Sequence, residues 1–161
     1  MLSLWRKILR TGRVAEPRPA RPGAGLPAVA SEFGGSVQVR HVDAGSCNGC
    51  EVEIGSAFGP VYDAERYGAR LVSSPRHADA LLVTGPVTRN MAEPLRRTYD
   101  AVPGPKAVVA VGDCARNCGV FAGAYGVTGA VRDVVPVDVE IAGCPPRPEA
   151  IVEGLRKLTG R

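Results

Sequence analysis

Short runs rich in β-branched residues alternate with helix-like stretches from residue 36 to the end of the chain, and this alternation restricts the folds that the chain can adopt. We predict strands over residues 37–42, 70–72, 80–84, 107–111 and 137–141. We predict helices over residues 51–58, 63–67, 91–99 and 148–158. Strands that alternate with helices favour a parallel sheet, which helices cover on both sides. We therefore expect an α/β fold with an open parallel sheet and helices on both faces.

The sequence divides into three segments. Residues 1–13 carry apolar side chains on one arc at helical spacing and basic side chains on the other, which predicts an amphipathic helix for an interface or a docking surface. The alternatives are a frayed basic terminus and an organelle transit peptide. Residues 14–35 contain four prolines and several glycines without hydrophobic periodicity, so we expect an extended arm. Residues 36–161 then form a single domain, because 161 residues suffice for one core but hardly for two.

The basic residues are concentrated near the start of the chain. Residues 1–40 carry seven basic and two acidic side chains, whereas residues 41–161 carry 13 basic and 14 acidic ones. A nucleic-acid-binding domain would need its basic residues on the folded part, so we expect no nucleic-acid partner. No run of 18 apolar residues occurs, and the sequence therefore predicts a soluble or peripherally attached protein.

Five cysteines, an odd number in a sequence without a secretory signal, argue against a disulfide framework. Cys47 and Cys50 follow the first predicted strand, Cys114 follows residues 107–111, and Cys144 follows residues 137–141. Because the carboxyl ends of parallel strands meet at one edge of the sheet, these four cysteines can lie together. Glycines flank them, and prolines follow the last one. Four thiolates suit a zinc ion or a [4Fe-4S] cluster, and Cys47-x-x-Cys50 alone would also suit a redox thiol pair.

Four segments carry a resemblance to a known family: "GSCNGCEVEI", "SPRHADALLVTGPVT", "PKAVVAVGDCA" and "PVDVEIAGCPPRPEAIVEGL". In this order and spacing they resemble the cluster-bearing small subunit shared by respiratory complex I, the NADH-quinone oxidoreductase, and the membrane-bound group 4 [NiFe] hydrogenases such as formate hydrogenlyase. The resemblance covers about residues 37–158. It implies a flavodoxin-like fold and one [4Fe-4S] cluster held by Cys47, Cys50, Cys114 and Cys144.

The resemblance also implies a role within a larger assembly. One cluster would relay electrons to or from a large catalytic subunit, and a ferredoxin-like subunit with further clusters and the membrane subunits of the complex would be the other partners. The protein would be an electron-transfer subunit that is not catalytic alone, peripheral on the cytoplasmic side of the cell membrane. Complex I subunits of this family have two adjacent cysteines at the first position, so the Cys-x-x-Cys spacing here favours the hydrogenase branch. Complex I-type quinone reduction is the alternative.

Three further residues of the matched segments each have a functional and a structural interpretation. Glu51 resembles a glutamate near proton paths in some hydrogenase small subunits, or it favours the start of a helix by its charge. Arg76 and His77 line a subunit interface or tune the potential of the cluster, or they fix a loop by hydrogen bonds.

Cys118 stands where related subunits usually have glycine. We expect a buried or near-cluster thiol without a ligand role, and the alternatives are a redox-active or regulatory thiol and an alternate ligand.

Two other classes of function stay open at this point. A stand-alone thiol oxidoreductase would use Cys47 and Cys50 and leave the other cysteines idle. A zinc-stabilised scaffold would use all four cysteines without any electron transfer.

Overall fold

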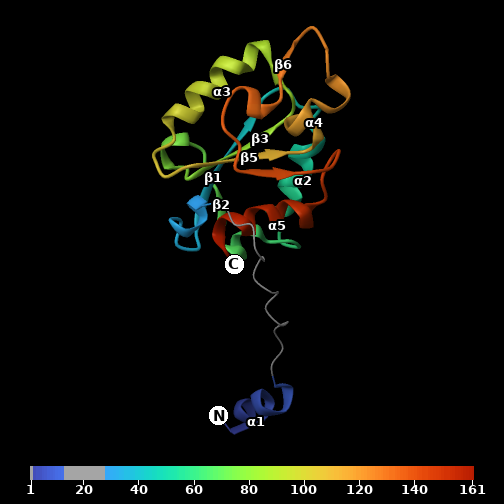
Figure 1. The fold of residues 1–161 in the computed structure, drawn as a ribbon. Helices are drawn as coiled ribbons and strands as arrows, with labels where there is room; N and C mark the ends of the chain where they lie inside the picture. Colours follow the sequence, from blue (N-terminus) through green and yellow to red (C-terminus); the bar gives the residue numbers. More distant parts are fainter. Residues whose placement is uncertain (1, 13–27) are drawn as a thin grey trace.

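Five short parallel strands form the main sheet of the protein, in the order β2–β1–β3–β5–β7 (Figure 1). The computed structural model describes residues 2–12 and 28–161. The strands are β1 (Val37–Asp43), β2 (Ala69–Leu71), β3 (Ala80–Thr84), β5 (Ala107–Val111) and β7 (Val139–Ile141). Counted along the chain, this spatial order is that of flavodoxin-like sheets, in which the strand order reverses beside the first strand. The predicted flavodoxin-like α/β fold is confirmed.

Helices cover both faces of this sheet, as expected. Helices α2 (Gly49–Ala57) and α5 (Pro148–Thr159) pack against each other and share one hydrophobic cluster with the sheet. Helices α3 (Arg89–Ala101) and α4 (Asp113–Asn117) bury residues in the cluster on the opposite face. Two short strands, β4 (Val87–Thr88) and β6 (Val127–Gly129), form a separate antiparallel pair. Short 3-10 helices occupy Ala28–Ser31, Ala64–Tyr67, Pro75–His77, Gly119–Phe121 and Val131–Asp133.

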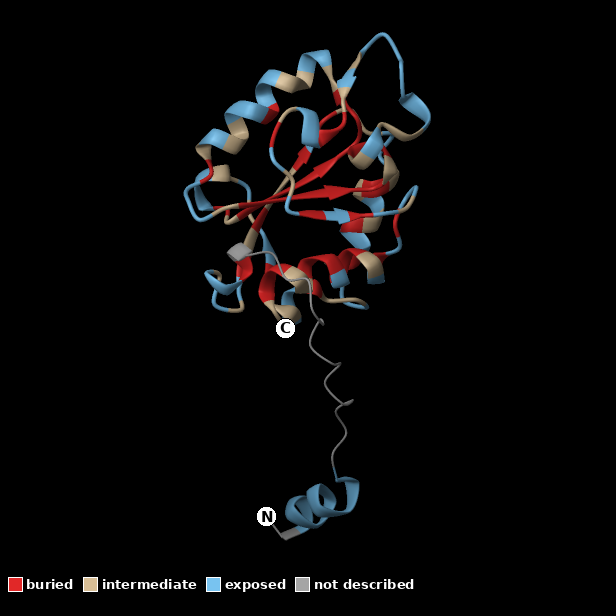
Figure 2. Ribbon diagram, in the orientation of Figure 1, coloured by how far each residue is buried: buried red, intermediate tan, exposed pale blue. Residues whose placement is uncertain are grey.

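The central strands have both faces buried. In β3, Ala80 and Leu82 belong to the cluster with α2 and α5, and Leu81 and Val83 belong to the cluster with α3. Every residue of β3 and β5 is buried, and Figure 2 shows these strands in red between the helices. Continuous apolar strands are expected where a parallel sheet is covered on both sides. The carboxyl edge of this sheet is therefore a rigid base for the loops that follow.

Most predicted elements are present, and the differences occur in short pieces. The strand predicted over residues 137–141 begins only at Val139, and the helix predicted over residues 63–67 is a single 3-10 turn. The β4–β6 pair and helix α4 were not predicted.

The N-terminal segment contains one described helix, α1 (Leu2–Thr11), where an amphipathic helix was expected. The predicted arm over residues 14–35 lies largely outside the described residues, so it stays a prediction. Within residues 2–12 and 28–161, no helix is long and apolar enough to cross a membrane.

Candidate metal centre

The segments that follow β1, β3, β5 and β7 meet at the carboxyl edge of the sheet and enclose a small cavity. The segments after β1, β5 and β7 bring Cys47, Cys50, Cys114 and Cys144 together around this cavity. Backbone and small side chains complete the lining: Ser46, Gly49, Gly85, Asp113, Gly143 and Pro145. All four cysteines are free thiols; Cys50 and Cys114 are buried, and Cys47 and Cys144 are exposed. Two sulfur ligands would thus face the protein interior and two would face outward.

The loop between β1 and α2 is fixed by its own hydrogen bonds. Asp43 Oδ1 accepts the backbone N–H groups of Gly45 at 2.8 Å and Ser46 at 2.7 Å. Gly45 has a φ of 131°, and a Cβ there would lie 2.3 Å from the side chain of Thr88, so only glycine fits. Asn48 adopts a left-handed conformation directly before α2 begins. This tight turn directs both Cys47 and Cys50 towards the cavity.

Asp113 joins the loops that carry the other two cysteines. Its Oδ1 accepts the backbone N–H of Gly143 at 3.0 Å, and its own N–H donates to the Gly143 carbonyl at 2.9 Å. Gly143 directly precedes Cys144, as Asp113 directly precedes Cys114. Arg116 Nη1 also donates to Asp113 Oδ1 at 3.2 Å. Sequence reasoning missed this residue, because the two bonded positions are 30 residues apart and only the fold brings them together.

Glycine allows the sulfurs to pack closely against the backbone. Gly112 has a φ of 87°, and a Cβ there would lie 2.7 Å from Cys50 Sγ. A Cβ on Gly119 would lie 3.1 Å from Cys114 Sγ. Backbone without side chains can approach a bound group and donate N–H bonds to it. Gly112, one of the glycines that flank the cysteines in the sequence, and Gly119 therefore have a steric role beside the sulfurs.

The four thiols are close enough to influence one another's ionisation. Burial raises the pKa of the Cys50 thiol to about 12, and the charges of Glu51 and of the other three cysteines act in the same direction. Burial also raises the pKa of Cys114, and Cys144 and Cys47 add to this effect. A nucleophilic thiol needs a lowered pKa, so Cys50 itself is not suited to be an attacking thiol. Positive charge inside the cavity would relieve the repulsion between four thiolates.

These residues fit an iron–sulfur cluster as a donor set. Four cysteines from three loops surround one cavity, glycine backbone approaches their sulfurs, and Pro145 helps to close the lining. Among the described residues, no three His, Cys, Asp or Glu side chains are placed to hold one metal ion. A single zinc ion, with bonds of about 2.3 Å to sulfur, would need its four sulfurs within about 4 Å of one another. A four-iron cluster binds each thiolate through a different iron and keeps the sulfurs farther apart.

Glu51 lies in the first turn of α2 and takes part in a mostly buried polar group with Thr84 and His41. The Thr84 hydroxyl donates a hydrogen bond to Glu51 Oε1, which lies 3.5 Å from His41 Nε2. His41 Nε2 and Thr84 Oγ1 are 3.0 Å apart. Burial lowers the pKa of His41, although the charge of Glu51 acts against this. Within the described residues, Glu51 Oε2 is buried without a hydrogen-bond partner.

Sequence reasoning assigned no role to Thr84. The one available signal was a hydroxyl at the end of the apolar run of β3, where all five residues are fully buried.

The remaining predicted residues lie outside the cavity. Arg76 and His77 belong to the 3-10 helix Pro75–His77 before β3, at the amino end of the strands, so the structure does not bring them to the cysteines. Any influence on a cluster would act along the length of β3. Cys118 ends α4 with a φ of 67°, and its N–H donates to the Cys114 carbonyl at 2.9 Å. Cys118 is thus a neighbour of the cavity and does not line it.

Comparison with known proteins identifies relatives over the same region. The family described as "NADH ubiquinone oxidoreductase, 20 Kd subunit" matches residues 47–158, which include all four cysteines of the cavity. The probable membrane-bound hydrogenase subunit mbhJ of Pyrococcus furiosus is 51% identical over 123 residues, which are 76% of this chain and 74% of that protein. Formate hydrogenlyase subunit 7 of Escherichia coli is 47% identical over 125 residues, 78% of this chain and 49% of that protein. An NADH-quinone oxidoreductase subunit of Herpetosiphon aurantiacus is 48% identical over 110 residues, 68% of this chain and 61% of that protein.

Solved structures agree with these relatives. A chain of the membrane-bound sulfane sulfur reductase, an archaeal respiratory membrane complex, superposes with a TM-score of 0.70 at 37% identity, over 81% of this chain and 72% of that one. A chain of an NAD⁺-reducing [NiFe]-hydrogenase superposes with a TM-score of 0.56 at 22% identity, over 72% of this chain and 86% of that one, and supports the fold alone. The resemblance found in the sequence is confirmed: the chain belongs to the family of the 20 kDa subunit of NADH ubiquinone oxidoreductase.

Proposed function

We propose that this protein is an electron-transfer subunit that carries one [4Fe-4S] cluster on Cys47, Cys50, Cys114 and Cys144. The observation that carries the proposal is the convergence of these four cysteines, from three separate loops, on one cavity. When bound, such a cluster accepts and releases single electrons. The protein would relay these electrons to or from the large catalytic subunit of a membrane-associated, hydrogenase-like complex.

The environment of each cysteine suggests what the chain contributes. Cys50 and Cys114 are buried, so they would shield the inner side of the cluster from water. Cys47 and Cys144 are exposed, so the outer side would face a partner subunit that closes the cavity. Burial, hydrogen bonds to sulfur and nearby charges set the potential of such a centre. The loops of this chain would thus fix both the position of the cluster and its potential.

The proposal requires partners, because one cluster must receive electrons and pass them on. Relatives named as subunits of hydrogenase, formate hydrogenlyase and NADH-quinone oxidoreductase support a multi-subunit assembly. We propose the large catalytic subunit, a ferredoxin-like subunit and membrane subunits as partners, with this chain peripheral on the cytoplasmic side of the cell membrane.

The hydrogenase branch is our first choice for the chemistry of the complex. The Cys-x-x-Cys spacing and the 51% identity to a probable membrane-bound hydrogenase subunit support it. Quinone reduction in a complex I-type assembly is the second candidate, supported by 48% identity to an NADH-quinone oxidoreductase subunit.

We further propose that Glu51 transfers protons beside the cluster. Glu51 directly follows Cys50 in the chain, and one of its carboxylate oxygens is buried without a hydrogen-bond partner among the described residues. Thr84 and His41 contact the other oxygen. The simpler interpretation, a first-turn glutamate that stabilises the start of α2, is worth about 0.3–1 kcal/mol. Glu51→Gln separates the two: slower proton-coupled turnover with unchanged thermal stability supports proton transfer, whereas lower stability with unchanged turnover rejects it.

Anaerobic isolation of the complex through a tag on this chain tests the electron relay. The reduced complex should show the low-temperature EPR signal of the cluster, and mixing with hydrogen should generate this signal within the time of one turnover. The matched control is the complex with Cys114→Ala, which should lack the signal. A signal that appears with a quinol and not with hydrogen would favour the second candidate. A cluster that stays oxidised during turnover would reject the relay.

A further inference from the structure

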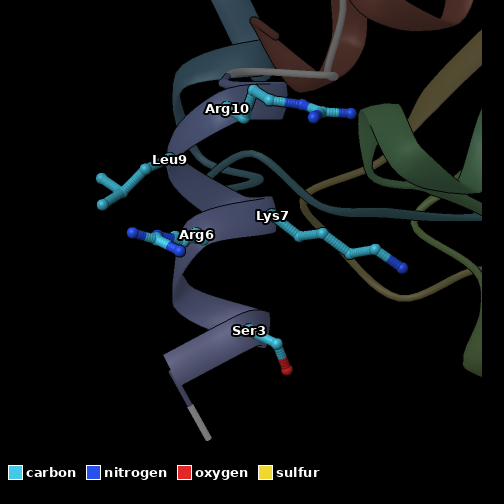
Figure 3. Close-up of a pocket in the computed structure, with 5 residues that line it drawn as sticks. All are labelled: Ser3, Arg6, Lys7, Leu9 and Arg10. Carbon is cyan, nitrogen blue, oxygen red and sulfur yellow. The ribbon is translucent and has the colours of Figure 1, made fainter.

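Helix α1 carries an apolar face, and two of its three basic side chains lie on the opposite side (Figure 3). Its apolar residues recur at helical spacing and are strongly exposed: Leu4 61%, Trp5 63%, Ile8 52% and Leu9 80%. Lys7 and Arg10 lie on the opposite side, and Arg6 points to the same side as Leu9, at the border of the apolar face (Figure 3). Figure 3 shows Leu9 pointing to one side of the helix and Lys7 and Arg10 pointing to the other. Four large exposed apolar side chains on ten residues form a surface that needs a partner.

The charge of α1 indicates the chemistry of this partner. Residues 2–12 contain three basic side chains and no acidic one, whereas residues 41–161 carry 13 basic and 14 acidic side chains. A helix with a purely basic polar face is suited to an anionic surface, because every charge on it is attracted. A helix that docks on protein has no such need for a single sign of charge.

The length of α1 determines how it can meet a bilayer. Ten residues form a helix about 15 Å long, half of the roughly 30 Å of hydrocarbon in a membrane. A helix of this length with Trp and Leu on one face and Lys and Arg on the other lies parallel to the surface, at the boundary of headgroups and acyl chains. Trp5 is well suited to this boundary, since its ring is amphipathic.

We propose that α1 binds an anionic lipid surface. Leu4, Trp5, Ile8 and Leu9 enter the acyl region, and Arg6, Lys7 and Arg10 contact lipid phosphates. This inference deepens the proposed membrane-side location and is independent of the cluster. The iron content of the same samples therefore tests the cluster separately.

Fluorescence of the full chain tests this directly, because Trp5 is the only tryptophan. Vesicles of phosphatidylcholine mixed with phosphatidylglycerol should shift the Trp5 emission to the blue and sediment with the protein. Vesicles of phosphatidylcholine alone should bind much more weakly. Each basic residue near an anionic surface is worth a factor of about five in affinity, so Lys7→Gln with Arg10→Gln should weaken binding about 25-fold. Leu9→Ser should weaken binding to both kinds of vesicle.

Matched controls lie on the sheet domain. Val61, which is 81% exposed, and Arg96 in α3 are exposed apolar and basic residues outside α1, so Val61→Ser and Arg96→Gln should leave vesicle binding unchanged. Circular dichroism of every variant verifies that the domain is folded. An unchanged Trp5 emission with anionic vesicles would overturn the proposal. So would a blue shift that appears only when the membrane subunits of the complex are present, which would assign α1 to a protein partner.

Discussion

The two ends of the main sheet differ in chemistry, although the same kind of bond holds them together. At the amino end, Asp138 Oδ2 accepts the N–H of Val108 at 2.8 Å and links the chain before β7 to β5. At the carboxyl end, Asp113 Oδ1 accepts the N–H of Gly143 at 3.0 Å and links the loops after the same two strands. The four cysteines of the cavity all lie at the carboxyl end. An aspartate that links two strands therefore occurs at both ends of the sheet and has a structural role. Only the carboxyl end also carries the cysteines and glycines of the candidate site.

The largest expected effect is loss of the cluster, which we expect when Cys114 is replaced but not when its neighbour Cys118 is replaced. Cys114→Ala should abolish the cluster, because three thiolates from this chain would leave one iron without its ligand. Cys118→Gly should retain it, since Cys118 lies beside the cavity and its φ of 67° suits glycine. Iron content and EPR of the reduced protein measure both. Loss of the cluster in Cys118→Gly would make Cys118 a ligand and remove the distinction.

A pH titration of the metal-free protein tests whether the carboxyl end of the sheet raises the pKa of the Cys50 thiol. The pKa of Cys50 is about 12 in the folded state and about 8.5 in an unfolded chain. The folded state favours the neutral Cys50 thiol more strongly than the unfolded chain does. The contribution of Cys50 to the free energy of unfolding is therefore fully present below about pH 8.5 and is lost as the pH rises towards 12. We expect a loss of about 2–4 kcal/mol in the free energy of unfolding over this range.

Chemical denaturation at several pH values measures this loss, and Cys50→Ala is the control. The variant should lose less stability than the wild type over the same range. Equal pH dependence in the two proteins would show that the fold does not raise the pKa of the Cys50 thiol.

The two aspartates offer the closest comparison of the two ends. Asp113→Ala and Asp138→Ala each leave a backbone N–H without its acceptor, so each should reduce the free energy of unfolding by about 1–3 kcal/mol. Only Asp113→Ala should also change the EPR line shape and speed the loss of iron to a chelator, because Asp113 and Gly143 directly precede two cysteines. The same change of the cluster in Asp138→Ala would show that general loosening of the sheet, and not the Asp113 bond, is responsible.

The sequence predicted the central strands well because packing determines them. β3 and β5 match the predicted ranges, since five-residue apolar runs buried on both faces have few alternatives. The β4–β6 pair escaped prediction because two or three residues are too short to show a period of two. Helix α4 has only five residues, and its sequence shows no helical period.

The sequence predicted that the cysteines of the candidate site lie close together, but it did not predict the hydrogen bonds that hold the site. The rule that parallel strands end at one edge placed Cys47, Cys114 and Cys144 near one another. The bonds from Thr84 to Glu51 and from Gly143 to Asp113 join residues 33 and 30 positions apart, and no local pattern reveals them. The predicted strand over residues 80–84 also places Arg76 and His77 before its start, and the structure has them there, at the opposite end of the sheet from the cysteines.

The most direct test of the central claim is the content of the cavity itself. Anaerobically purified protein should contain four iron and four acid-labile sulfide ions per chain, as one [4Fe-4S] cluster requires, and should give its EPR signal on reduction. Zinc in place of iron, or four thiols that react freely with an alkylating reagent in the protein as purified, would contradict the claim.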